Sequence, residues 1–103
     1  MTDRLGTLKS LVSQNPADSR TRYMLAMELR NTGDHEAAVL EYRDILARDA
    51  DYVAAYYQGG QTLEKLDRPG EARKLYEDGI VACRRTGDTH TQSELEEALA
   101  ALP

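Results

Sequence analysis

The sequence predicts an all-α protein of about six helices, arranged as antiparallel helix-turn-helix repeats that stack one on the next. Two observations predict this fold. Apolar residues follow helical spacing through most of the 103 residues, and the pattern of residues 25–50 recurs 34 residues later at 59–84. A 34-residue period with a turn in its middle is typical of helical repeat arrays, which bury their core by stacking. The expected helices span about 3–14, 18–31, 34–48, 51–66, 68–85 and 89–101.

Composition and charge narrow the possible partners. The chain has 13 basic and 18 acidic residues, a net charge of −5, and its longest basic run is Arg84-Arg85. Nucleic acids and anionic lipids are bound through clustered Lys and Arg, so we expect neither nucleic acid nor a membrane as the partner. The sequence shows no signal peptide and no apolar stretch of about 18 residues. A cytoplasmic location is expected, although the missing signal is also consistent with a segment cut from a longer chain.

The first predicted helix ends at Asn15-Pro16, because the residue before proline avoids the α region. Its apolar stripe aligns with later helices at intervals of 34 residues. The aligned sets are Leu8, Tyr42 and Tyr76; Leu11, Ile45 and Gly79; and Val12, Leu46 and Ile80. This helix therefore corresponds to the second helix of a pair whose first helix is missing.

The second and third helices form a full pair. Asp18 and Ser19 are residue types that favour the N-cap, and Asp34 is expected to cap the following helix in the same way. Gly33 is expected just past the end of the second helix, where a left-handed residue is common. The apolar residues at helical spacing are Tyr23, Leu25, Ala26, Leu29, Ala38, Tyr42, Ile45 and Leu46.

The fourth and fifth helices repeat this pair. Asp51 is expected to cap the fourth helix, and Pro69 fits the first turn of the fifth, where its missing N–H is not needed. Gly59 and Gly60 interrupt the fourth helix at roughly 1 kcal/mol each relative to Ala. Close packing accounts for Gly60, and we expect its replacement by Ala to be nearly neutral or stabilising. For Gly59 two explanations stay open: a gap filled by a neighbouring Tyr, and a functional kink.

The last helix follows Gly87-Asp88, another glycine that ends a helix beside an aspartate that caps the next. Its apolar stripe consists of Leu95, Ala98, Leu99 and Leu102, and its outer face carries Glu94, Glu96 and Glu97. A solenoid needs a terminal element with a polar outer face, so this helix is expected to close the array.

These residues resemble the tetratricopeptide repeat family, whose motif has an aromatic, then Leu-Gly, Tyr, a later Ala-x-x-x-Phe and a final Pro. Residues 19–52 carry Leu25-Ala26, Leu29, Gly33, Ala38 and Tyr42, and residues 53–86 carry Tyr56, Gly60, Leu63, Ala72 and Tyr76. The departures are Arg22 and Ala50 in the first repeat and Gly59 and Arg84 in the second. With a two-residue insertion after Gly87, Leu95 and Leu99 fall on the Leu and Tyr positions of a third repeat.

The resemblance implies a single domain over residues 1–103, folded as a short right-handed superhelical solenoid. Its parts would be a half-repeat helix at 1–16, full repeats at 19–52 and 53–86, and a capping helix at 88–103. Ala38 and Ala72 are expected where the two helices of a pair approach closely. Tyr42 and Tyr76 are expected to fill the space between one pair and the next.

No arrangement of reactive side chains predicts an enzyme. Nucleophilic catalysis needs a positioned base beside the nucleophile, and Cys83 lies on an apolar stripe that indicates a buried thiol. His35 and His90 are far apart in the sequence, and both are expected to face solvent. No His, Cys or carboxylate residues have the spacing of metal ligands. We therefore expect no catalytic site, no cofactor and no metal.

In tetratricopeptide arrays the first helices of successive pairs line a concave groove that receives peptides, and the register carries this groove onto the present chain. The candidate groove residues are Arg20, Tyr23, Met24, Met27, Arg30, Ala54, Tyr57, Gln58, Gln61 and Lys65, with Ser93, Glu94 and Glu97 from the last helix. Tyr23 and Tyr57 are expected to face solvent. The alternative is that some of these residues only cover the edge of the core.

The family's chaperone-binding members use Lys and Asn side chains in this groove to hold a peptide's C-terminal carboxylates. Tyr23 and Tyr57 stand where the first such Lys would be, and Met27 and Gln61 replace an Asn. The sequence therefore disfavours a carboxylate clamp.

Two function classes remain open. The chain is either an adaptor that binds a peptide or protein segment in the groove, or a structural module that self-associates through an open end of the array. The expected state is a monomer or a weak homo-oligomer. The outer surface of the first helix carries Arg4, Lys9 and Ser10, and this polarity favours a cap over an interface.

Overall fold

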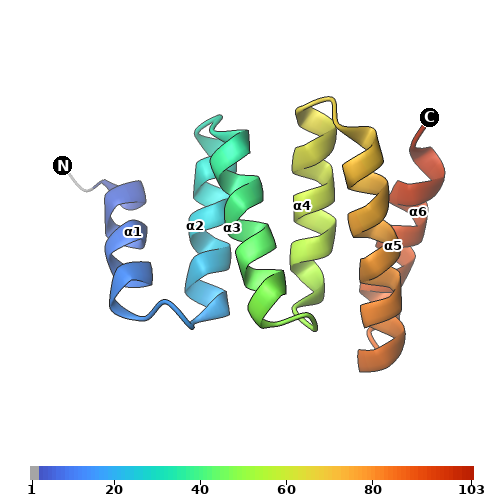
Figure 1. Ribbon diagram of the computed structural model, residues 1–103, viewed down its shortest axis with the longest axis horizontal. Helices are drawn as coiled ribbons and strands as arrows, with labels where there is room; N and C mark the ends of the chain where they lie inside the picture. Colours follow the sequence, from blue (N-terminus) through green and yellow to red (C-terminus); the bar gives the residue numbers. More distant parts are fainter. Residues whose placement is uncertain (1–2) are drawn as a thin grey trace.

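The structure, a computed structural model, describes residues 3–103 (Figure 1). This part of the chain folds into six α-helices and contains no strand. The helices are α1 (Arg4–Gln14), α2 (Ser19–Asn31), α3 (His35–Arg48), α4 (Val53–Lys65), α5 (Pro69–Thr86) and α6 (Thr89–Ala101). Each bound lies within two residues of the range expected from the sequence, and the all-α prediction is confirmed.

The helices follow one another in a row from α1 to α6, with α6 partly behind α5 in this view, and each runs antiparallel to the next (Figure 1). Each helix packs mainly on its neighbours in the chain, and α4 also contacts α6. The molecule measures 42 × 28 × 19 Å, with α1 at one end of the row and α6 at the other. The first helices of successive pairs, α2, α4 and α6, therefore all run in the same direction.

Local chemistry sets most of the helix ends, as the sequence predicted. Gly33 and Gly87 follow α2 and α5 with φ angles of +91° and +78°, a region that glycine enters without steric cost. Pro69 is the first residue of α5. The capping carboxylates accept hydrogen bonds from backbone N–H groups: Asp18 from Arg20 and Thr21, Asp34 from Ala37, and Asp88 from Thr91.

Asp51 does not cap α4, so that prediction is wrong. The helix begins at Val53, and Tyr52, which holds the N-cap position, makes no side-chain cap bond. Asp51 lies one residue ahead of the N-cap position and instead accepts a hydrogen bond from Nε of Arg85 at 2.7 Å. This ion pair ties the turn between α3 and α4 to the C-terminal end of α5.

The core consists of two clusters of buried side chains along the row. One cluster is built mainly by α1, α2 and α3, and the other mainly by α4, α5 and α6. Ala38, Ala72, Tyr42 and Tyr76 are all completely buried within these clusters, as the sequence predicted.

Each of the two central tyrosines keeps a polar partner. The Tyr42 hydroxyl donates to Sδ of Met27 at 3.0 Å. The Tyr76 hydroxyl donates to the Glu64 carboxylate and accepts a hydrogen bond from Nε2 of Gln61 at 2.8 Å. Burial raises the pKa of both phenols well above the usual value of 10.0, because a buried site disfavours the charged form.

The adjacent glycines of α4 let two other helices approach its backbone. A Cβ on Gly60 would lie 2.2 Å from Cε1 of Tyr76, so no side chain fits there without moving the ring. A Cβ on Gly59 would lie 3.0 Å from Cδ1 of Leu75 and 3.4 Å from Cβ of Tyr42. The space over Gly59 is therefore filled by a tyrosine of α3 and a leucine of α5, and α4 continues unbroken through both glycines.

Arg22 occupies the position where the repeat motif has an aromatic residue. Its side chain is only 12% exposed, and it forms ion pairs with Glu41 at 2.8 Å and Asp44 at 3.0 Å, both on α3. It also donates to the carbonyl oxygen of Pro16 at 3.1 Å. A charged cluster thus joins α2 to α3 in place of an aromatic contact.

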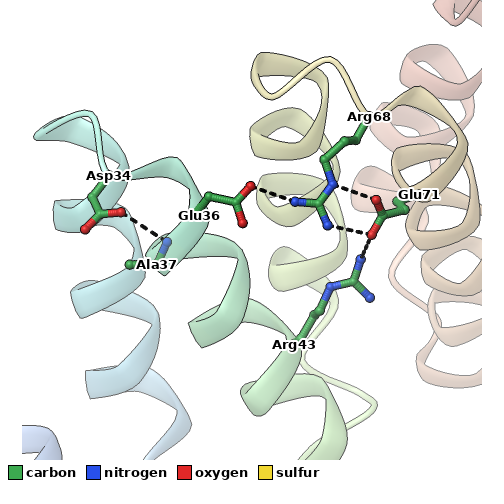
Figure 2. Close-up of polar contacts among 6 residues, drawn as sticks. All are labelled: Asp34, Glu36, Ala37, Arg43, Arg68 and Glu71. Carbon is green, nitrogen blue, oxygen red and sulfur yellow. Dashed lines mark hydrogen bonds and ion pairs between the residues drawn. The ribbon is translucent and has the colours of Figure 1, made fainter.

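A second ion-pair network joins the second helices of the two full pairs (Figure 2). Arg68, in the turn before α5, contacts Glu36 of α3 at 2.8 Å and Glu71 of α5 at 2.6 Å. Arg43 of α3 reaches the same Glu71 at 2.8 Å. The hydrogen bond from Arg68 lowers the pKa of Glu71. These side chains are partly or largely exposed, so the network contributes modestly to stability and does not involve the candidate groove.

Candidate functional site

A hollow lined by candidate groove residues lies between α4 and α6. It has a volume of about 330 Å³ and is lined by Tyr57, Gln61, Glu94, Glu97 and Ala98. The first four of these were candidates from the sequence. They come together because α4 and α6 are in contact and run in the same direction.

The two groove tyrosines do not simply face solvent, which corrects the expectation. Tyr23 is half-buried, and its ring meets those of Tyr42 and Tyr52 with centroid distances of 5.9 and 5.4 Å. Tyr57 is also half-buried and packs against the core cluster of α4, α5 and α6. Each ring therefore covers part of the core and keeps part of its surface exposed.

The polar groups of the groove are already joined to one another in part. Arg30 of α2 donates to Oε1 of Gln58 of α4, which links two groove helices directly. Nε2 of Gln61 donates to the Tyr76 hydroxyl, so its side-chain carbonyl oxygen is the group that remains for a partner. In Gln58 the remaining group is the side-chain NH₂. Gln58 and Gln61 therefore leave one donor group and one acceptor group for further hydrogen bonds at this surface.

Charge is distributed unevenly among the groove helices. The basic candidates lie on α2 and α4: Arg20 and Lys65 are exposed, and Arg30 is half-buried. The hollow beside α6 is acidic through Glu94 and Glu97.

Met24 lies apart from this arrangement. It is 38% exposed and lines a separate hollow of about 340 Å³ between α1 and α2, together with Arg4, Thr7, Leu8 and Leu11. The sequence placed Met24 in the groove and did not reveal this hollow. The 34-residue register could have revealed the hollow, because it aligns Leu11, on a helix without a pair partner, with Ile45 of a complete pair. In the structure Ile45 is 1% exposed, whereas Leu11 is 43% exposed.

The reactive side chains remain scattered. Cys83 is completely buried, and burial raises the pKa of its thiol. His90 is exposed, whereas His35 is half-buried, so the expectation that both face solvent is wrong for His35. Within residues 3–103, no group of three or more His, Cys, Asp and Glu side chains is placed to hold a metal ion. None of the helices in the same range is long and apolar enough to cross a membrane.

Comparison with known proteins shows which family and which solved structures this chain is similar to. Residues 19–52 match the tetratricopeptide repeat family. The solution structure of a tetratricopeptide repeat domain protein from Salinibacter ruber is 35% identical, with 84% of this chain and 87% of that chain covered and a TM-score of 0.79. A solution structure of a protein from Bordetella parapertussis is 25% identical, with 97% and 87% covered and a TM-score of 0.82.

A more distant structure shares the fold alone. The tetratricopeptide repeat protein YrrB is 20% identical, with 90% of this chain and 46% of that chain covered and a TM-score of 0.78. No curated protein matches the chain. The 35% identity to the Salinibacter ruber domain over most of both chains, together with the repeat match, shows that this chain belongs to the tetratricopeptide repeat family.

Proposed function

We propose that this chain binds a peptide or protein segment in the groove lined by α2, α4 and α6. Tetratricopeptide repeat domains are generally protein-interaction modules and are typically not catalytic. The observation that carries the proposal is the hollow between α4 and α6, whose volume of about 330 Å³ can receive a side chain of a partner.

The chemistry of this hollow supports recognition of an extended segment. Tyr57 offers a half-buried ring, and aromatic side chains of this kind are common energetic anchors of interfaces. The Gln61 carbonyl oxygen, held in place by the bond from Nε2 to Tyr76, supplies a fixed acceptor. Because the groove carries both basic and acidic side chains, we expect the affinity to depend only moderately on salt.

The experiment is a comparison of three variants in a quantitative pull-down with mass spectrometry. Tyr57→Ala and Glu97→Lys change the hollow, and Glu77→Lys makes the same charge change on the exposed surface of α5. We expect the first two to lose the partner that the unmodified chain captures, with a cost of about 2 kcal/mol or more for the tyrosine. Glu77→Lys should retain it.

Two results would contradict the proposal. One is full capture by a folded Glu97→Lys variant, and the other is equal loss of capture by Glu77→Lys. Tyr23 is left unchanged in this design because its ring packs on Tyr42 and Tyr52. Tyr57 also packs on the core, so loss of capture by Tyr57→Ala counts only if circular dichroism shows that the variant is folded, and Glu97→Lys is the variant that separates binding from stability.

A second candidate function is self-association through an end of the array. The observation that favours it is the exposure of Leu11, which is 43%, at a register position where Ile45 is 1% exposed. An apolar side chain at a core position of the repeat, without a covering helix in the described part of the chain, marks a surface where another helix fits.

A further inference from the structure

The two end helices of the row have complementary places in the repeat. The 34-residue register makes α1 a second helix, because Leu8 aligns with Tyr42 and Tyr76. The same register, with its two-residue insertion, makes α6 a first helix, because Leu95 aligns with Leu25. Among residues 3–103, α1 has no first-helix partner and α6 has no second-helix partner. One α6 and one α1 would together make a complete pair.

The exposed side of α1 carries an apolar hollow beside the polar residues that favoured a cap in the sequence. Its hollow of about 340 Å³ is lined by Arg4, Thr7, Leu8, Leu11 and Met24. Apolar side chains form its floor, since Leu8 is buried while Leu11 and Met24 remain partly exposed. Within the chain, α3 packs on α2, the first helix of the same pair, and also on α4, and Ile45, which is equivalent to Leu11, is only 1% exposed there.

The exposed side of α6 carries the opposite charge. Its outer face includes Glu96, which aligns with Ala26 and Gly60 of the earlier first helices, and both of those are buried. The helix has three glutamates and neither Lys nor Arg. By contrast, α1 has Arg4 and Lys9 and no acidic residue.

The aligned positions bring these charges together. Ala26 of α2 and Ala38 of α3 are small, fully buried residues of one core cluster. The register places Glu96 of α6 at the position of Ala26, and Arg4 of α1 at the position of Ala38. If α6 stood beside the α1 of another copy as α2 stands beside α3, then Glu96 and Arg4 would face each other.

We infer that α6 of one copy of this chain docks beside α1 of a second copy, head to tail, and completes a helix pair there. Arg4 is available for this contact, because its side chain is 64% exposed although it also pairs with Glu28 at 3.0 Å. An Arg–Glu pair is bulkier than two alanines, so the helices stand farther apart than within one chain, and the contact is weak and salt-dependent. A head-to-tail contact does not close on itself and produces open chains of copies. This inference rests on the second candidate function and is independent of the groove.

The test uses the 103-residue chain in sedimentation velocity and light scattering from micromolar to millimolar concentration. We expect the mass to rise with concentration above the 11.5 kDa of one chain and to fall when salt is added. Leu11→Glu blocks the α1 face, and Glu96→Lys blocks the α6 face. Both positions are exposed, so the fold is retained, which circular dichroism checks. Glu77→Lys on α5 is the matched control and should associate like the unmodified chain.

Mixing the two blocked variants gives the decisive measurement. Each blocked variant alone should remain a single chain, because each lacks one of the two faces. An equimolar mixture should form one-to-one dimers and nothing longer, since only one pair of intact faces remains. The double variant Arg4→Glu, Glu96→Lys reverses both charges and should recover association that Glu96→Lys alone has lost.

The possible outcomes distinguish failure of the head-to-tail contact from failure of self-association itself. A single chain at every concentration would overturn both. Association that survives in both blocked variants would keep self-association but overturn the head-to-tail contact. A mixture of blocked variants that forms no dimer would show that the two faces do not meet.

Discussion

At the scale of single residues, contacts between tyrosine side chains and glycines set how closely neighbouring helices approach. The Tyr76 ring lies directly on Gly60, and Cβ of Tyr56 would be 2.6 Å from a Cβ placed on Gly79. These contacts need the absence of a side chain, and helix propensity alone gives no hint of them. Both tyrosines keep a polar contact that phenylalanine would lack: the Tyr56 hydroxyl donates to the carbonyl oxygen of Ala50, and the Tyr76 hydroxyl accepts from Gln61.

Gly60→Ala is the sharpest test of this packing. From the sequence, the change would be neutral or stabilising. With the structure, we expect it to destabilise by about 1–3 kcal/mol, because the new methyl group overpacks the site and the buried ring of Tyr76 cannot move away freely. Urea unfolding measures the difference.

Gly70→Ala is the control for this change. Gly70 is also helical, but nothing lies within 4 Å of the position of its Cβ. It should be neutral or stabilise by up to about 1 kcal/mol. Equal effects of the two substitutions would show that the ring contact does not limit the size of residue 60.

Removal of a buried tyrosine ring should have a larger effect. We expect Tyr42→Ala to lower the free energy of unfolding by about 3–5 kcal/mol, as for other large core truncations. Tyr42→Phe keeps the ring and loses only the hydrogen bond to Met27. It should therefore lower the free energy of unfolding by only a small fraction of the loss expected for Tyr42→Ala. Thermal and urea unfolding of the two variants give the comparison, and a Tyr42→Ala protein that melts with the unmodified chain would contradict the assigned core.

Individual helices begin and end at residues that satisfy their free backbone groups. Asp18, Asp34 and Asp88 each accept hydrogen bonds from the first turn of a helix, and Gly33 and Gly87 allow the chain to turn back. The helices α1, α4 and α5 start without a side-chain cap bond, although α5 has Pro69 in its first turn, where an N–H is not needed.

This difference predicts unequal effects of two similar substitutions. Asp34→Ala removes the bond to the N–H of Ala37 and should cost about 1 kcal/mol. Asp51→Ala removes only an exposed ion pair with Arg85 and should cost clearly less. Chemical denaturation of both variants measures the two costs, and a larger loss from Asp51→Ala would mean that the α4 start is capped after all.

Across the whole molecule, stability depends on the continuity of the row, because each helix pair buries its apolar face on the next. The contact between α3 and α4 joins the two core clusters. Tyr42 and Tyr76 each belong to one of the two clusters and are fully buried, so ionisation of either phenol is expected to destabilise the packed helices around it.

Alkaline pH should therefore unfold the chain. Both phenols have a pKa raised above 10.0 by burial, so the folded state retains their protons where the unfolded state loses them. This contribution to stability is complete below the unfolded pKa and decreases as the pH rises beyond it. Tyrosinate absorbance and circular dichroism recorded together should show two tyrosines ionising only as the helical signal is lost. Ionisation of all six tyrosines before any loss of helix would contradict their burial.

The sequence by itself determined the helices, their order and the family. Those features depend on chemistry within a few residues: an aspartate before a helix, a glycine after it, a proline in a first turn. The 34-residue period extended this local information to the stacking order, because equivalent positions of a repeat have equivalent surroundings. It also identified Tyr57, Gln61, Glu94 and Glu97 as residues of one surface, and the structure brings them together around one hollow.

Only the tertiary structure decided how much space each of these positions has. The half-burial of Tyr23, the ion pairs that replace an aromatic residue at Arg22, the ring over Gly60 and the separate hollow beside Met24 all depend on how closely neighbouring helices approach. That distance is set jointly by side chains from two or three helices. A repeat pattern states which positions are equivalent, but the volume left between helices follows only from packing all of them at once.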